Sequence, residues 1–340
     1  MRPLYLLLAA LSVSSVCAAP EPESARPEPS SPEEPTLTRP VRSPAVLTVV
    51  DRHGGVALLD EAGAVLSTVA GHATDVVANE ALVATFEPAT DEADGLVRVF
   101  TTEGDALAES ASYPTTVVTG GLLHVGDGVL GWSVAEAASL FVIDANGSGG
   151  LTITEPSSVR TLLGEDGSRI VECLVPGATS PRVDLVRLSA AGGLRGTGEV
   201  SVTAAAEARL GPGDGRRLVV SVDAAALVLA WETGPSEVVA EVALGSTLEG
   251  VSTRGETIAI LLASPPRLVL RAAEGRVEAL DLPGSIAWDP RPSHRIALTA
   301  EAVWIASPTA LYRVATGTSP LSAVLVGDGT AAVVALPASR

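Results

Sequence analysis

The feature that most constrains this chain is a repeat of about 42 residues. Along the sequence, a short apolar run is followed by a few small or polar residues and then by a turn glycine. This happens at Gly63, Gly104, Gly147, Gly192, Gly234, Gly275 and Gly317, with successive spacings of 41, 43, 45, 42, 41 and 42 residues. A fixed period of this length means that one supersecondary unit recurs and buries its apolar faces against its neighbours.

Each repeat has the pattern of a small antiparallel sheet. A second apolar run follows each glycine, as in residues 64–69 and 237–242, and another hairpin precedes the first run in several copies. Glycine supplies the positive φ that tight hairpin turns require. Four strands in about 40 to 45 residues make one blade of a propeller. The sequence therefore predicts an all-β fold over residues 46–340: a single seven-bladed β-propeller of four-stranded antiparallel blades.

The two ends of the repeat region predict how the propeller closes. Only 18 residues run from Val46 to Gly63, too few for the strands that precede this turn elsewhere, and 23 residues follow Gly317. Together these two pieces make one period. We therefore expect the C-terminal run Thr330–Leu336 to supply the first strand of the blade that Val46 begins. The alternative is that residues 322–326 supply it and the last run is an extra strand.

These repeats resemble those of a known superfamily. The hairpins of the form xDGxxLxV and the runs that end in Asp-Ala-Asn-Gly or Asp-Glu-Ala-Gly are similar to repeats of bacterial secreted β-propellers of the YVTN, quinoprotein-like and WD-repeat kind. The resemblance covers residues 46–340. Gly71-His72 matches the start of a WD repeat, but no repeat ends in Trp-Asp, so the subfamily is unassigned. Such propellers include enzymes, binding modules and scaffolds, so the resemblance implies a fold and leaves the function open.

The first 45 residues have the composition of an export signal and a linker. Residues 1–18 combine one early charge, Arg2, with an apolar run and a small-residue cleavage site at Ala18, as in a signal peptide. The alternative is lipidation at Cys17. Residues 19–45 are rich in Pro, Glu and Ser and predict a disordered linker. We therefore expect an exported protein, periplasmic or extracellular, whose only contact with a membrane is a lipid anchor at Cys17 in the lipoprotein alternative, which tethers it to the outer membrane.

The charge of the chain excludes several functions. The formal net charge is −18, with 22 basic and 40 acidic residues, and no residue is a lysine. A nucleic-acid partner is therefore not expected, because binding to phosphate backbones needs clustered basic residues. Schiff-base, P-loop and Ser-Lys chemistry all need a lysine. No catalytic residue is predicted.

One segment matches the spacing of a calcium loop. Oxygen-bearing side chains stand at the required places in residues 144–155, with glycine at the sixth position, and the candidate ligands are Asp144, Asn146, Ser148 and Glu155. The alternative is an ordinary Gly-rich hairpin, because the segment coincides with the turn at Gly147. Calcium is the one cofactor that the sequence suggests.

The candidate binding residues come from two irregular connections. The stretch Pro283–His294 is long and rich in proline, and it carries Trp288, Asp289, Arg291 and His294. In a propeller it shares a face with the connection at residues 87–95, which carries Asp91, Glu92 and Asp94. Loops concentrate binding residues, and Trp and Arg are frequent anchors of interfaces. The alternatives are a stiff linker whose Trp288 caps the core and an acidic run that is simply solvated.

The sequence thus favours a binding scaffold in the bacterial cell envelope for an unknown protein or small ligand, with the domain itself monomeric. The first alternative is a propeller enzyme, a hydrolase or lyase with its site at the central channel. The second is a structural envelope component.

Overall fold

The computed structural model describes residues 44–79, 81–125, 235–283 and 294–336 continuously, and between residues 129 and 231 mainly the strands. Every regular element in this described part is a β-strand. No helix long and apolar enough to cross a membrane occurs among these residues. The all-β prediction is confirmed.

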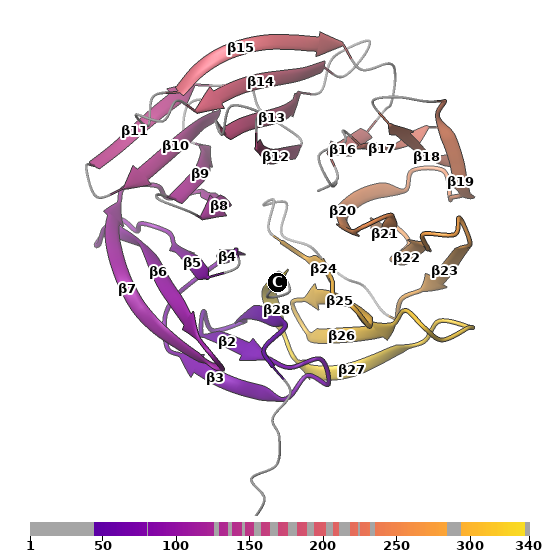
Figure 1. The fold of residues 1–340 in the computed structure, drawn as a ribbon, viewed down its shortest axis with the longest axis horizontal. Helices are drawn as coiled ribbons and strands as arrows, with labels where there is room; N and C mark the ends of the chain where they lie inside the picture. Colours follow the sequence, from indigo (N-terminus) through magenta and orange to yellow (C-terminus); the bar gives the residue numbers. More distant parts are fainter. Residues whose placement is uncertain are drawn as a thin grey trace, which may run out of the picture. The chain divides into compact units, whose positions relative to one another are not determined.

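The strands form four-stranded antiparallel sheets, one for each repeat (Figure 1). The N-terminal sheet has the order β28-β1-β2-β3 and contains β28 (Thr330–Ala335), β1 (Leu47–Asp51), β2 (Val56–Leu59) and β3 (Val65–Val69). The next contains β4 (Asp75–Ala78), β5 (Leu82–Glu87), β6 (Gly95–Glu103) and β7 (Ala106–Thr115). The third contains β8 (Gly120–Val125), β9 (Val129–Val134), β10 (Ala138–Asp144) and β11 (Gly147–Thr152).

The remaining four sheets follow the same meander. They contain β12 (Ser158–Leu163), β13 (Arg169–Val175), β14 (Arg182–Leu188) and β15 (Leu194–Ser201); then β16 (Glu207–Leu210), β17 (Leu218–Asp223), β18 (Ala226–Trp231) and β19 (Glu237–Glu241). The last two contain β20 (Thr247–Arg254), β21 (Thr257–Ala263), β22 (Arg267–Arg271) and β23 (Val277–Asp281), and β24 (Ile296–Leu298), β25 (Ala302–Ser307), β26 (Ala310–Ala315) and β27 (Ala323–Asp328).

Burial explains the two kinds of strand seen in the sequence. The second strands are apolar runs because both faces of the sheet are covered: all six residues of β25 are buried, and so are six of the seven residues of β21. The fourth strands β3, β19, β23 and β27 have no buried residue and carry the polar positions. Apolar clusters then join one sheet to the next, as in the cluster that includes Phe86 of β5 and Phe141 of β10. Hydrophobic burial between sheets is the main stabilising force of such a stack.

The C-terminal run lies beside the N-terminal strand. β28 pairs with β1 in antiparallel register from Leu47 opposite Ala335 to Asp51 opposite Thr330. The backbone N–H of Leu336 also donates to the carbonyl of Val46, 2.8 Å away. The competing run at residues 322–326 belongs to the sheet of β24 to β27 instead. The N-terminal sheet is therefore built from both ends of the repeat region.

The first strands of the sheets contact one another in chain order. β4 contacts β8, which contacts β12, and the series continues through β16, β20 and β24 to β28, which in turn contacts β4. Each first strand thus touches the first strands of the two neighbouring sheets.

Candidate functional site

A buried aspartate lies where three sheets meet. Asp75 is the first residue of β4, and its side chain is only 3% exposed. Its Oδ2 accepts the backbone N–H of Leu122 in β8 at 2.9 Å. Its Oδ1 lies 3.1 Å from Nδ1 of His294, which donates because a carboxylate only accepts. A buried carboxylate needs such partners, since an unpaired one is very costly.

His294 is the residue from the sequence-predicted set that belongs to this site. It lies just before β24, and its backbone carbonyl accepts the N–H of Val333 in β28 at 2.6 Å. Through its backbone and its ring, His294 therefore links the sheet of β24 to the sheets of β28 and β4. This junction of Asp75, His294 and the Leu122 amide is called the inner junction below.

The electrostatics of the inner junction favour a charged imidazole. Burial by itself lowers the pKa of His294, but the negative charge of Asp75 and its hydrogen bond outweigh that effect, so the pKa of His294 is raised above its ordinary value. The ring remains 35% exposed, so solvent can exchange protons with it. A carboxylate that holds Nδ1 also fixes the tautomer and the orientation of the ring. The arrangement can bind an anion or transfer a proton through the other nitrogen.

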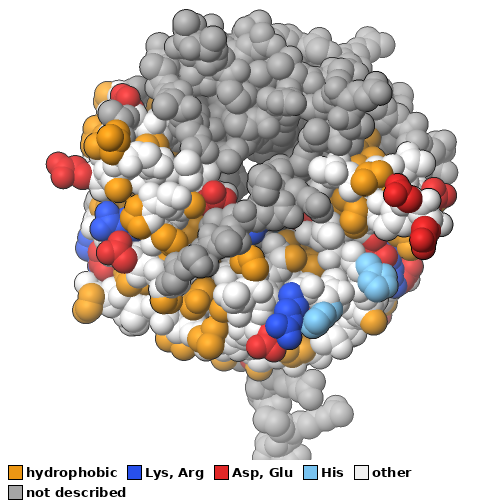
Figure 2. Space-filling model, turned by 180° about the vertical axis from the view of Figure 1, so that it is seen from behind, with side chains coloured by type: hydrophobic (Ala, Val, Ile, Leu, Met, Phe, Trp, Pro, Cys, Tyr) orange, Lys and Arg blue, Asp and Glu red, His pale blue; other side chains and the backbone are white. Residues whose placement is uncertain are grey.

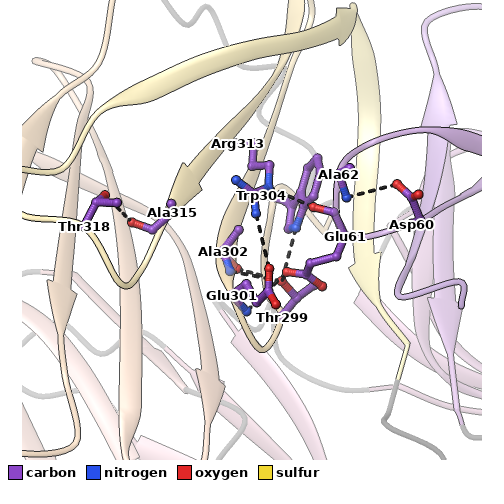
Figure 3. Close-up of polar contacts among 10 residues, drawn as sticks. All are labelled: Asp60, Glu61, Ala62, Thr299, Glu301, Ala302, Trp304, Arg313, Ala315 and Thr318. Atoms are coloured by element: carbon purple, nitrogen blue, oxygen red, sulfur yellow. Dashed lines mark hydrogen bonds and ion pairs between the residues drawn. The ribbon is translucent and has the colours of Figure 1, made fainter. Parts of the chain in front are cut away.

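A second polar cluster joins the N-terminal sheet to the sheet of β24 to β27 (Figure 3). The carboxylate of Glu61, in the turn after β2, accepts the hydroxyl of Thr299 and the backbone N–H of Glu301. The indole N–H of Trp304 donates to the same Thr299 hydroxyl at 3.3 Å. Arg313 donates to the backbone carbonyl of Glu61 at 2.9 Å and lies over the Trp304 ring. These contacts are called the terminal seam below.

The acidic loop is exposed and separate from the inner junction. Asp91, Glu92 and Asp94 are all exposed, in a turn held by the Thr90 hydroxyl, which accepts the N–H of Ala93 at 3.1 Å. Among the described residues, no hydrogen bond or ion pair joins this loop to His294. Figure 2 shows acidic side chains at several separate places on the described surface of one face, not gathered into one patch. The role of these three residues stays a prediction.

The other candidate residues lie wholly or partly outside the described residues. Trp288, Asp289 and Arg291 fall in the gap at 284–293, Asn146 and Glu155 fall in two further gaps, and Cys17 precedes the described part. For the calcium hypothesis only strand backbone is described: Asp144 ends β10 and pairs with Gly147, and Ser148 pairs with Ile143. Elsewhere in the described residues, no three His, Cys, Asp or Glu side chains converge in a way that could hold a metal ion.

Asp75 is the site residue that sequence reasoning missed. It is the one charged residue of the apolar run Asp75-Val76-Val77-Ala78, a strand that is expected to be buried and to leave no solvent-exposed position for a carboxylate. That was the available signal: a lone carboxylate that leads a buried strand needs donors from elsewhere in the fold. Its partners, 47 and 219 residues away, are not visible in the sequence.

No protein-family model and no curated protein matches the chain. Solved structures do. A functionally unknown protein from Desulfotomaculum acetoxidans matches with a TM-score of 0.61 at 12% identity, over 86% of this chain and 99% of that one. Apo AztD from Citrobacter koseri matches with a TM-score of 0.55 at 13% identity, over 86% and 98%. A putative 6-phosphogluconolactonase from Bacteroides uniformis matches with a TM-score of 0.56 at 14% identity, over 86% and 99%.

At these identities the likeness extends to the fold alone. The four-stranded sheets of this chain repeat with the period of propeller blades. The chain therefore has the β-propeller fold, without an assigned subfamily.

Proposed function

We propose that this chain is an exported binding scaffold: a closed seven-bladed propeller that holds a protein or small ligand on the face formed by its longer connections. Two observations support seven blades and closure. The sheets correspond one to one with the repeats, and their first strands touch in a series that returns from β28 to β4. The pairing of β28 with β1 supports the joining of the two ends in one blade.

The observation that carries the binding role is the position of His294. It is the last residue of the long connection that begins at Pro283, and its contacts with β28 and Asp75 tie that end to three sheets. A loop with a fixed end loses less entropy on binding than a free one. Loops positioned by a rigid scaffold are where binding residues concentrate.

Capture by wild type and variants from the native envelope tests this role. We expect the double variant Trp288→Ala with Arg291→Ala to lose the captured partner while its melting temperature stays within about 2 °C of wild type. Glu103→Gln, at the last residue of β6 and at the other end of the sheet, is the control and keeps capture. A double variant that melts normally and still captures the partner contradicts the proposed face, and one that melts early assigns Trp288 to the core.

The inner junction favours a second candidate, an enzyme that uses His294 for proton transfer. A histidine held through Nδ1 by a buried aspartate is a common general acid or base. Screening of ester and lactone hydrolysis with wild type and His294→Gln distinguishes the two functions. An activity that the substitution abolishes, with capture intact, supports the enzyme. Capture without any turnover supports the scaffold.

Export and tethering are part of the proposal, and the sequence of residues 1–45 supports them. Mass spectrometry of the protein from a bacterial envelope gives its mature N-terminus. We expect a chain that begins at Ala19. Labelling with palmitate that disappears in Cys17→Ser supports the lipoprotein alternative instead.

A further inference from the structure

A cavity of about 220 Å³ lies between the sheet of β20 to β23 and the sheet of β24 to β27. Its walls come from four turns of one kind: those after β20, β22, β24 and β26. In an antiparallel meander these turns lie at the opposite end of the sheets from the connection that ends at His294. The cavity is therefore separate from the inner junction and from the proposed binding face.

The floor of this cavity is apolar and its walls carry hydroxyl groups. Leu270 and Leu298 line it and are 4% and 3% exposed, so they form a dry base. Thr257 and Thr316 also line it, and their side chains make no hydrogen bond with another described residue. The hydroxyl of Thr299, by contrast, is already engaged in the terminal seam (Figure 3). An apolar base with a few free donors is typical of small-ligand sites.

Two arginines line the cavity, and they differ in whether a carboxylate of the chain already pairs with them. Arg276 pairs with Glu274, 3.3 Å away, and also with Glu278. Arg254 lines the same cavity and makes no hydrogen bond or ion pair with another described residue. The other described arginines of this sheet are paired, Arg267 with Asp281 at 2.7 Å and Arg271 with Glu237 at 3.1 Å. The cavity therefore has one guanidinium that is free to bind an anion.

The size of the cavity sets the size of the ligand. At about 30 Å³ for each water in liquid, it holds the volume of about seven waters. Drug-sized ligands occupy sites of about 300 to 1,000 Å³, so this one admits only a small molecule or the end of a longer chain. One free positive charge calls for one negative charge, and planar bidentate contact suits a carboxylate best.

We propose that this cavity binds the carboxylate end of an apolar ligand, with the carboxylate on Arg254 and the apolar body on Leu270 and Leu298. A short branched fatty acid and the C-terminus of a peptide that ends in leucine both have this chemistry.

Matched acid and amide probes test the site on the mature chain. The chain is titrated with 4-methylpentanoate and, separately, with 4-methylpentanamide, and saturation-transfer difference NMR measures the binding of each. The acid binds with a Kd in the millimolar range, and the amide, which has the same shape without the charge, binds at least about tenfold more weakly. Acetyl-Ala-Ala-Leu with a free C-terminus and its C-terminal amide form the peptide arm. Tighter binding of the free peptide than of the small acid identifies a peptide end as the ligand, and the reverse identifies a free acid.

Variants assign the charge contact. Arg254→Gln weakens binding of the acid at least about tenfold, or about 1.4 kcal/mol, without a change in melting temperature, because Arg254 is exposed and unpaired. Arg267→Gln is the control: it removes the same charge from the same sheet outside the cavity and leaves the affinity unchanged. Thr316→Val weakens binding about threefold if its hydroxyl donates to the ligand. Equal affinity for acid and amide, an unaffected Arg254→Gln, or no binding of any probe overturns the proposal.

Discussion

The N-terminal sheet is bounded by two interfaces that are built differently. On the side of β24 to β27, the terminal seam gives its polar groups partners: the Thr299 hydroxyl donates to Glu61 and accepts the indole N–H of Trp304. Both sides also have an apolar cluster, and the one on the side of β4 to β7 includes Val50, Val83 and Phe100. The polar contacts on that side are fewer: Arg98 donates to the carbonyl of Ala70 at 3.0 Å, and the N–H of Leu107 donates to the Ser67 hydroxyl at 3.3 Å. Thr48 and Thr85, two residues from Val50 and Val83 on the same strand faces, are buried there with no hydrogen-bond partner among the described residues.

The difference follows from the connectivity of the chain. The strands β1 to β3 lead directly into β4, so the chain itself keeps the second interface in register. No peptide bond joins β1 to β3 to the preceding sheet; β28, which follows β27 directly in the chain, reaches them only through non-covalent contacts, namely strand pairing and apolar packing. Polar contacts are directional and specify one alignment, whereas apolar packing tolerates several. The terminal seam therefore adds specific polar contacts where no covalent connection reaches β1 to β3 from the preceding sheet.

The largest effect is expected from removal of residues 329–340. This deletes β28, so β1 loses its hydrogen-bonded partner and the buried Ala332 and Val333 leave the core. An unpaired strand edge also favours aggregation. We expect loss of the cooperative melting transition by circular dichroism. Removal of residues 337–340 alone, which leaves β28 intact, is the control and melts as wild type. If the variant without residues 329–340 melts at the wild-type temperature, β28 is not needed to complete the N-terminal sheet.

Alanine substitutions at two equivalent turn glycines measure how tightly the terminal seam is packed. Gly63 and Gly275 occupy the same turn in different sheets, with φ of +89° and +84°. A Cβ on Gly63 would lie 2.2 Å from Val326 in the seam, whereas one on Gly275 would meet nothing within 4 Å. We expect Gly275→Ala to cost about 1 kcal/mol from backbone strain alone, and Gly63→Ala about 2 to 4 kcal/mol. Urea unfolding measures both. Equal losses would mean that the seam is not tightly packed at Gly63.

Thr299→Val tests the polar contacts of the seam. Thr299 is 3% exposed, and its hydroxyl donates to Glu61 and accepts the buried indole N–H of Trp304. Its loss leaves the indole N–H without a partner and removes one of the two donors to Glu61. A buried group without its partner costs about 1 to 3 kcal/mol. We expect a loss of that size in the free energy of unfolding. A neutral result would show that the shape of the seam, and not its hydrogen bonds, holds the two sheets together.

Thr85→Val makes the opposite change in the second interface. Here the hydroxyl has no described partner, and valine has the same shape without the polar group. We expect stabilisation of about 1 kcal/mol, measured by the same urea titration. Destabilisation would mean that the hydroxyl has a partner, such as an ordered water, and that the two interfaces are more alike than they look.

The smallest effect concerns pH, because His294 contacts both β28 and Asp75 in β4. Its pKa is raised in the folded state, so the stability that it contributes is fully present below its ordinary value of 6.5 and is lost as the pH rises through the raised value. We expect the difference in urea midpoint between wild type and His294→Gln to shrink as the pH rises above 6.5. With the ring 35% exposed, the shift stays small. A difference that does not vary with pH contradicts the ion pair.

The turn glycines show that the sequence predicts the hairpins but not how tightly each turn is packed against the neighbouring sheet. Residues 60–63 and 272–275 both end in a glycine after small and acidic residues, and both were correctly placed in hairpins. Nothing in either segment distinguishes the crowded Gly63 from the open Gly275, since the difference depends on Val326 and Trp304. Similarly, the prediction that Pro283–His294 carries binding residues drew attention to His294 but could not pair it with Asp75.

The sequence by itself determined the repeat, the strands and the turns, because these depend on apolar periodicity and on residues a few positions apart. Contacts between the sheets were decided only by the tertiary structure. His294 meets Asp75 across 219 residues, and Thr299 meets Glu61 across 238. Likewise, the tertiary structure pairs Arg267 and Arg271 with carboxylates and leaves Arg254 without one among the described residues. Side chains so far apart in the sequence leave no local pattern, and only the stacking of the sheets brings them within bonding distance.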